Sequence, residues 1–242
     1  MSKTDSDISP DSIRSGKSLK DQNRWQLWII LATNTLFLYG IVQSNAIRAD
    51  GLRALFAGTQ NLLPVGFALT ITAVINGVLS IDMKNRLVFL RWTCALPGHR
   101  AFSQYAKNDP RIEPSDLPRL CGGTVPTGAV DQNRAWYRIY KSVENDPAVR
   151  QVHRDYLLMR DYTGISALLM VFYGIVGLYA IPSLRIVLLY ALILLTQYIV
   201  VRQAASNYGI EFVTTVLARK GGWTKAAANR KKKPKDTPER LG

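Results

Sequence analysis

The sequence predicts an all-α membrane protein with four transmembrane helices in two hairpins and a small cytoplasmic helical layer formed by extensions of spans two to four. The main observation behind this prediction is the distribution of charge. Lysine and arginine gather around four uncharged apolar runs, which lie at residues 25–44, 62–81, 162–181 and 186–201. About 20 helical residues match a hydrocarbon core of roughly 30 Å, so each of the first three runs is long enough to span a bilayer.

The first hairpin follows a polar N-terminal segment. Residues 1–24 are rich in serine, aspartate and lysine, and we expect them to form a disordered cytoplasmic tail. The span at residues 25–44 opens with two tryptophans, a residue type enriched at membrane interfaces. Residues 45–61 then form a short external loop before the second span at residues 62–81.

The second hairpin has the shorter connection. Residues 182–185 include Pro182, which favours a tight external turn, so the third and fourth spans must be antiparallel neighbours. The fourth run has only 16 residues, between Arg185 and Arg202. Arginine extends such a span because its head group reaches the interface while its stem lies along apolar surface.

Lysine and arginine also predict the orientation of the spans. Five of them precede the first span and ten follow the fourth, whereas residues 45–61 contain two and residues 182–185 contain one. Because positively charged flanks stay on the cytoplasmic side, we expect both termini and the loop at residues 82–161 to be cytoplasmic. The expected location is a bacterial inner membrane.

The loop at residues 82–161 is where we expect any specific activity. Residues 87–96 are predicted to continue the second span as an interfacial helix that ends at Pro97-Gly98. Asp131 is the expected N-cap of a helix at residues 132–143, whose apolar side chains recur at three- and four-residue spacing.

The third and fourth spans are predicted to extend into this layer. Asp146-Pro147 is a helix start with no breaker before residue 181, which predicts one continuous helix. The fourth helix is expected to continue over residues 202–220 and to end at Gly221-Gly222. Residues 221–242 would form a basic disordered tail that attracts anionic lipid. Nucleic acid is a less favoured partner, because the tail lacks aromatic or motif context.

Arginine outnumbers lysine in the loop, and guanidinium groups bind phosphates and carboxylates in bidentate geometry. We therefore expect either a pocket for an anionic ligand, for example a nucleotide, or intramolecular pairing of these arginines with the acidic residues of the loop. The candidate ligand-binding residues are Arg91, Arg100, Arg111, Arg119, Arg134 and Arg138.

Catalytic chemistry has weaker support in the sequence. The candidate acid–base residues, if the protein is an enzyme, are His99, His153, Asp155 and Asp161. No glycine-rich phosphate loop, nucleophile elbow or metalloprotease helix is present, and the cysteines and histidines lack the two close pairs of a structural zinc site. The sequence therefore predicts no defined catalytic residue, no metal site and no cofactor.

Three functions are compatible with these observations. The leading hypothesis is a non-enzymatic membrane protein whose basic cytoplasmic layer senses a protein partner or an anionic ligand and acts through self-association of the spans. The alternative is a membrane-embedded enzyme acting on lipid head groups at the cytoplasmic face. A small transporter or channel is third, because the spans contain no aspartate, glutamate, lysine, arginine or histidine. The architecture alone resembles the small multi-span effector proteins of bacterial anti-phage systems, in which a cytoplasmic signal triggers damage to the membrane.

Overall fold

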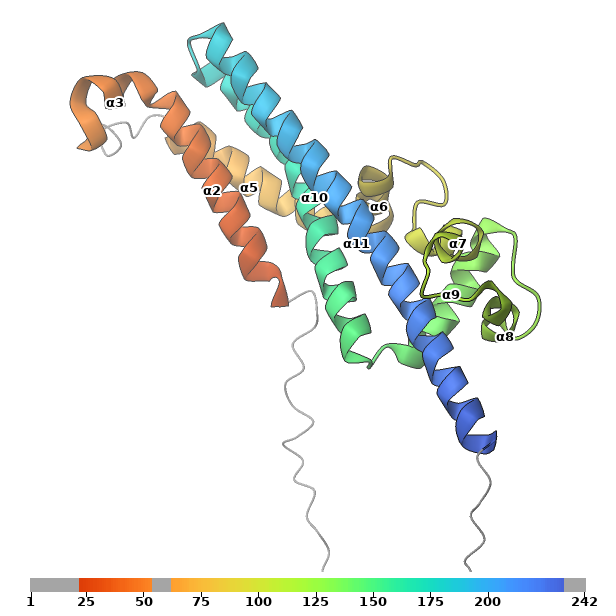
Figure 1. Cartoon of the computed structure of the whole chain (residues 1–242). Coiled ribbons are helices and arrows are strands. Elements are labelled where there is room, and N and C mark those ends of the chain that lie inside the picture. The colour runs from red at the N-terminus through yellow and green to blue at the C-terminus, as the bar shows by residue number, and fades with distance from the viewer. Residues whose placement is uncertain (1–21, 54–61, 233–242) are drawn as a thin grey trace, which may run out of the picture.

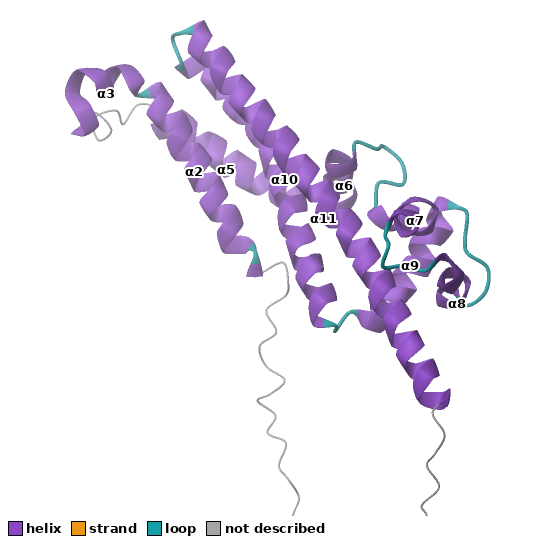
Figure 2. Ribbon diagram, viewed as in Figure 1, coloured by secondary structure: helices purple, strands orange, loops and turns teal. Residues whose placement is uncertain are grey.

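The computed structural model describes residues 22–53 and 62–232, and its regular elements are all helical in these two ranges (Figure 1 and Figure 2). The elements in chain order are α2 (Arg24–Val42), α3 (Ser44–Asp50), η2 (Gly51–Arg53), α5 (Leu62–Val78), α6 (Ile81–Phe89), η4 (Pro97–Arg100), η5 (Ala101–Tyr105), α7 (Ala106–Asn108), η6 (Pro114–Asp116), α8 (Leu117–Cys121), α9 (Ala129–Val143), α10 (Pro147–Ala180) and α11 (Leu184–Lys232). Within the described residues, α2, α10 and α11 are long and apolar enough to cross a membrane, and the bent pair α5 and α6 would make a fourth span. These helices are compatible with an integral membrane protein.

The hairpin of α10 and α11 dominates the fold (Figure 1). The side chain of Asp146 accepts hydrogen bonds from the backbone N–H groups of Ala148 (2.9 Å) and Val149 (3.3 Å), and Pro147 occupies the first turn. The prediction of one unbroken helix through the third apolar run is therefore confirmed to within a residue. Only Ile181, Pro182 and Ser183 separate the two helices, one residue fewer than the predicted turn.

The predicted end of the last helix is wrong. We expected the helix to end at Gly221-Gly222 and residues 221–242 to be disordered, yet α11, which is 49 residues long, continues to Lys232. Glycine permits a left-handed helix end but does not require one, and neither of these two glycines has a positive φ. Alanine and lysine are good helix formers, and they are frequent in the sequence that follows. Residues 233–242 lie outside the described residues.

The second apolar run is shorter as a helix than predicted. α5 ends at Val78, and α6 leaves at an angle of 103°. Ser80 causes the break, because its side chain accepts a hydrogen bond from the backbone N–H of Met83 (3.2 Å) and so caps a new helix, with Asp82 in the first turn. The extension of span two is thus a separate helix lying across the bundle rather than a straight continuation.

Three further boundaries differ from the predictions. The helix expected over residues 87–96 ends at Phe89, where Leu90 takes a left-handed conformation (φ 49°). The helix expected to begin after Asp131 begins at Ala129, so Asp131 lies in its first turn, where an acidic side chain is favourable, and is not its N-cap. The expected external loop is helical over Ser44–Arg53, and residues 54–61 and the tail residues 1–21 lie outside the described residues.

Two hydrophobic cores lie along the hairpin. The bundle core joins α2, α5, α10 and α11, and its buried residues are Leu31, Leu38, Tyr39, Val65, Ala68, Ile165, Leu169, Tyr173, Ile181, Val187, Tyr190 and Leu194. The loop core joins the short helices to the other ends of α10 and α11, and its buried residues are Ala101, Phe102, Tyr105, Ala106, Ile112, Leu117, Leu120, Ala135, Trp136, Ile139, Val143, Val149, Tyr156, Phe212, Val213, Val216 and Leu217. Both long helices therefore contribute to both cores.

Candidate functional site

The two cores meet at α6, which packs against both α10 and α11. Three charged side chains are buried there. The Nζ of Lys84 lies 3.3 Å from Oδ1 of Asp161, and the Nε and Nη2 groups of Arg160 donate to the same oxygen at 3.1 and 2.9 Å. The side chains of the Lys84–Asp161 pair are 5% and 4% exposed. Two cations share one carboxylate, so this charged cluster (Lys84, Arg160 and Asp161) has one excess positive charge.

Polar side chains of the two long helices hold the rest of α6. The hydroxyl of Tyr156 donates to the amide oxygen of Asn85 in a buried contact. On the opposite side, Tyr198 donates from its hydroxyl to the backbone carbonyl of Leu87 (3.1 Å), and Arg202 donates to that of Val88 (3.2 Å). Carbonyls at a helix C-terminus have no partner within the helix, and a cation is favourable there. α6 is therefore fixed to both members of the hairpin.

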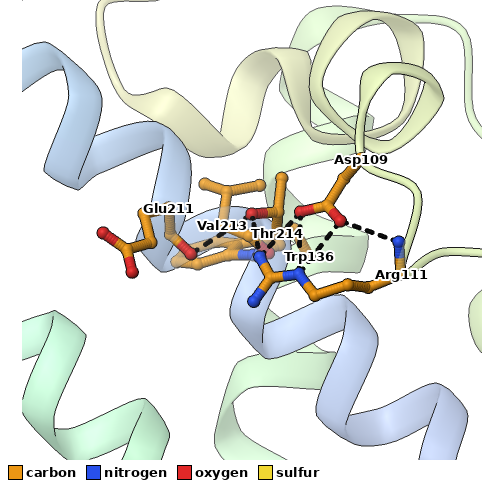
Figure 3. A network of polar contacts seen from close by, with 6 residues as sticks. All are labelled: Asp109, Arg111, Trp136, Glu211, Val213 and Thr214. Atoms are coloured by element: carbon orange, nitrogen blue, oxygen red, sulfur yellow. Dashed lines mark hydrogen bonds and ion pairs between the residues drawn. The ribbon is translucent and has the colours of Figure 1, made fainter.

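Figure 3 shows a second network, which fastens the loop to α11. Arg111 donates through Nη2 to Oδ2 of Asp109 (2.7 Å) and to the hydroxyl of Thr214 (3.0 Å). These hydrogen bonds from Arg111 hold the pKa of Asp109 at about 2, below its usual range, against the opposing effect of partial burial. The indole N–H of Trp136 donates to the backbone carbonyl of Val213 (3.4 Å). Arg111 is thus a structural contact between the loop and α11.

Aromatic rings fill the centre of the loop core. Phe212 lies parallel to the ring of His153, with 4.5 Å between centroids, and meets Trp136 edge to face at 5.2 Å. The hydroxyl of Tyr140 lies 3.2 Å from Nδ1 of His153. Burial, with a smaller contribution from Arg160, lowers the pKa of His153 to about 4. His153 is therefore a neutral packing residue near neutral pH.

The six candidate arginines do not converge on one pocket. Arg134 and Arg138 line a cavity of about 530 Å³ beside α8 and α9, together with the ring of Tyr137. Arg111 and Arg119 pair with Asp109 and Asp116, and each also donates to a threonine of α11.

The remaining arginines have other surroundings. Arg100 lies over the rings of Phe89 and Tyr105 and donates to the Tyr105 hydroxyl (3.1 Å). Arg91 lies exposed in the loop after α6. Within the described residues, Arg134 and Arg138 are thus the pair best placed to bind one anion.

The four candidate acid–base residues are also separate. The Nδ1 of His99 lies 3.1 Å from the carbonyl oxygen of Leu96. Asp155 accepts a hydrogen bond from Gln151 (2.8 Å) on the surface of α10, while His153 packs in the loop core and Asp161 belongs to the charged cluster. Among the described residues, no hydrogen bond or ion pair joins any two of these four. The arrangement favours structural roles for His153 and Asp161.

Neither cysteine belongs to a group of side chains, within the described residues, that could hold a metal ion. Cys94 is exposed and Cys121 is half-buried, and both are free thiols. Burial raises the pKa of the Cys121 thiol, which makes it less reactive as a thiolate. Across residues 22–53 and 62–232, no group of three or more histidine, cysteine or acidic side chains could hold a metal ion.

Sequence reasoning identified Asp161 but missed its two partners. Lys84 and Arg160 flank the second and third apolar runs at the same predicted interface, but no signal in the sequence assigns both of them to one carboxylate. Gly209 was missed too. An added Cβ there would lie 2.8 Å from Phe89 and 2.9 Å from Tyr156, which shows how closely α11 approaches α6 and α10.

The fold and this junction define a helical protein, compatible with an integral membrane protein, in which two long helices join an apolar bundle to an aromatic helical unit. Comparison of the chain with protein-family models, with curated proteins and with solved structures finds no match.

Proposed function

We propose that this chain is a non-enzymatic multi-pass membrane protein that couples an event at its cytoplasmic helical layer to the transmembrane bundle. In this proposal α2, α5, α10 and α11 are four spans in two hairpins, and the termini and the loop core are cytoplasmic. The distribution of lysine and arginine supports this orientation. Self-association of the spans would then alter membrane integrity, as in a bacterial defence effector.

The continuity of α10 and α11 through both cores carries the proposal. At 1.5 Å per residue, the 34 residues of α10 and the 49 residues of α11 extend about 50 and about 75 Å, well beyond a hydrocarbon core of roughly 30 Å. Tyr156 in the loop core and Ile165 in the bundle core lie on the same uninterrupted helix. A displacement of the loop core therefore has a rigid route into the bundle.

The cavity beside α8 and α9 is the proposed position for the anionic ligand. Arg134 and Arg138 lie one helical turn apart on α9 and on the same side of the helix, with the exposed ring of Tyr137 beside them. The nearest acidic partner, Asp131, is 3.5 Å from Arg134, and both side chains are largely exposed, so this pair is weak and open to competition. Two guanidinium groups and a ring suit a phosphorylated ligand.

The experiment is expression of the full chain in bacteria while membrane potential is recorded with a potential-sensitive dye. We expect overproduction to lower the potential and viability. Four glycines inserted between Leu157 and Leu158 should abolish this effect, because they separate the two parts of α10 that the cores hold. The same insertion after Thr224 lies beyond Leu217, the last buried residue of the loop core, and should have no effect. Membrane fractionation verifies that each variant inserts. A wild-type chain that accumulates in the membrane without changing the potential contradicts the proposal.

The lipid-modifying enzyme stays the rival prediction, and two substitutions test it. His99→Ala and Asp155→Ala remove candidate acid–base groups that lie outside both the loop core and the charged cluster. The coupling proposal predicts that both variants lower the membrane potential as the wild type does. It also predicts that the double variant Arg134→Ala/Arg138→Ala no longer lowers the potential. The opposite pattern, in folded and inserted protein, would favour the enzyme.

A further inference from the structure

A groove runs along the bundle between α2 and α5, beginning at the charged cluster. Its first part is a cavity of about 340 Å³, with Arg24, Lys84, Asp161 and Asn76 among its lining residues. A second hollow of about 390 Å³ follows, lined in part by Leu69 and Val74. Both hollows have Trp28 and Ala73 among their lining residues, so they adjoin. We call this the α2–α5 groove; the two helices that form it lie side by side in Figure 1.

The two ends of the groove differ in polarity. At the first end, Arg24, Lys84 and Asp161 line the cavity, and the carboxylate of Asp161 binds both Lys84 and Arg160. The wall from Asn76 to Leu69 covers eight residues of α5, which rise about 10 Å along the helix, and beyond Asn76 it is formed mainly by apolar side chains. A ligand that fits this surface has an anionic head and an apolar tail.

An unsatisfied polar atom lies at the change in polarity. The Oδ1 of Asn76 is buried and has no hydrogen-bond partner among the described residues. A buried acceptor without a donor is costly, and this oxygen lies toward Gly164 of α10. Rotation of the Asn76 side chain into the cavity that Asn76 lines would let a ligand hydroxyl or N–H group remove that cost. The head group that suits this end of the groove therefore has both a negative charge and a hydrogen-bond donor.

From these three observations we propose that the α2–α5 groove binds one anionic phospholipid with a hydroxyl-bearing head group, of the phosphatidylglycerol type. The phosphate binds Arg24 and Lys84, a head-group hydroxyl donates to Asn76, and one acyl chain lies along Trp28 and Ala73. Trp28 is about half exposed, as expected for an aromatic side chain at the membrane interface. The inference requires α2 and α5 to lie in a bilayer, but it does not rest on the coupling function.

Native mass spectrometry of the full chain released from nanodiscs tests the site. From discs containing equal amounts of phosphatidylglycerol and phosphatidylcholine, the wild type should retain one phosphatidylglycerol per chain in preference to phosphatidylcholine. Arg24→Gln should weaken this retention by about fivefold, the effect expected for one basic residue at a membrane surface. Arg185→Gln, which removes an equal charge from an exposed residue at the far turn, should leave retention unchanged.

A second pair of variants tests the apolar wall. Ala73→Trp fills the groove where its two hollows join and should abolish retention, whereas Ala191→Trp adds the same bulk on an exposed position of α11 and should not. Size-exclusion chromatography verifies that both variants are folded. Equal retention of the two lipids, or identical behaviour of the two tryptophan variants, would mean that the protein retains annular lipid only and would overturn the inference.

Two other occupants are also distinguished by this experiment. Displacement of the retained lipid by an excess of inorganic phosphate would mean that the site recognises phosphate alone, without the acyl chain. A lipid-free dimer that Ala73→Trp dissociates would mean that a second copy of the chain covers the groove. Either result contradicts the lipid site. The count of retained lipids does not depend on membrane potential, so failure here leaves the coupling proposal standing.

Discussion

The bundle core and the loop core both bury apolar side chains between helices, but their polar side chains make different kinds of contact. In the bundle, many hydroxyl and amide side chains bond to their own helix, as Asn34 does to Ile30 and Thr163 to Met159, and large apolar side chains such as Phe67 and Leu178 face outward. In the loop core, rings stack across elements, and Trp136 and Arg111 bond to a helix distant in sequence. An outward apolar surface suits lipid, whereas water requires the apolar groups to be enclosed. The contrast supports a boundary between two solvents near the charged cluster.

The largest expected effect comes from breaking the junction between the cores. Asp161→Asn leaves Lys84 and Arg160 buried without their shared carboxylate, and loss of one partner from a buried ion pair costs about 3–5 kcal/mol of unfolding free energy. Asp155→Asn removes only a partly exposed pair with Arg154, typically worth about 0–1 kcal/mol. Chemical denaturation in detergent measures both. Equal destabilisation by the two substitutions would show that the charged cluster does not hold the junction together.

A matched pair of leucines tests the two solvents directly. Leu217 in the loop core and Leu169 in the bundle core are both 0% exposed. Leu217→Ala should lower the unfolding free energy by about 2–5 kcal/mol, because the protein loses both the hydrophobic transfer energy of the leucine and its packing contacts. Leu169→Ala should cost less, since lipid chains are as apolar as the bundle and packing alone is lost. Chemical denaturation of the two variants in lipid nanodiscs compares their losses of unfolding free energy. A larger cost at Leu169 would argue against a lipid environment for the bundle core.

A pair of glycines tests the close approach of α11 to α6 and α10. Gly209→Ala places a methyl group against Phe89 and Tyr156, and overpacking of this kind typically destabilises by about 1–3 kcal/mol. Gly222 lies in the same helix, and a Cβ added there meets no neighbouring atom of the described residues within 4 Å. Gly222→Ala should therefore stabilise by about 0.5–1 kcal/mol, because alanine favours the helix. Thermal unfolding followed by circular dichroism gives the sign of each change. Stabilisation at both positions would contradict the close packing.

The smallest expected effect at neutral pH comes from His153, whose protonation should destabilise the loop core only as the pH falls. His153 has a pKa of about 4 in the folded protein against an ordinary value of 6.5, so the unfolded chain binds more protons between these limits. The stability of the loop core should therefore be intact above pH 6.5 and fall as the pH drops toward 4. Hydrogen exchange of α9 and α11 across this range measures the effect. His153→Phe should flatten the dependence while keeping the stack on Phe212, and an unchanged slope in this variant would assign the effect to another group.

Local signals predicted some elements well. Asp146 and Pro147 specify the start of α10 through contacts within one helical turn, and the spacing of Trp136, Ile139 and Val143 identified the buried side of α9. The sequence also contained the signal for the α5–α6 break, because Ser80 followed by Asp82 is a helix start, but the apolar run concealed it. At Gly221-Gly222, in contrast, we took a weak signal for a helix end. Glycine permits a helix to end but does not require it, and α11 continues through both residues.

The sequence by itself determined the helical class, the apolar lengths and the continuity of α10, because these depend on composition and on contacts between neighbouring residues. Only the tertiary structure decided which charges meet. Lys84 lies 77 positions before Asp161, and Tyr198 and Arg202 cap α6 across more than 100 residues, so no periodic pattern links them. The α2–α5 groove likewise depends on the tertiary structure, because the bend after Val78 places Lys84 of α6 beside Asp161 of α10, in the cavity that Arg24 of α2 and Asn76 of α5 also line.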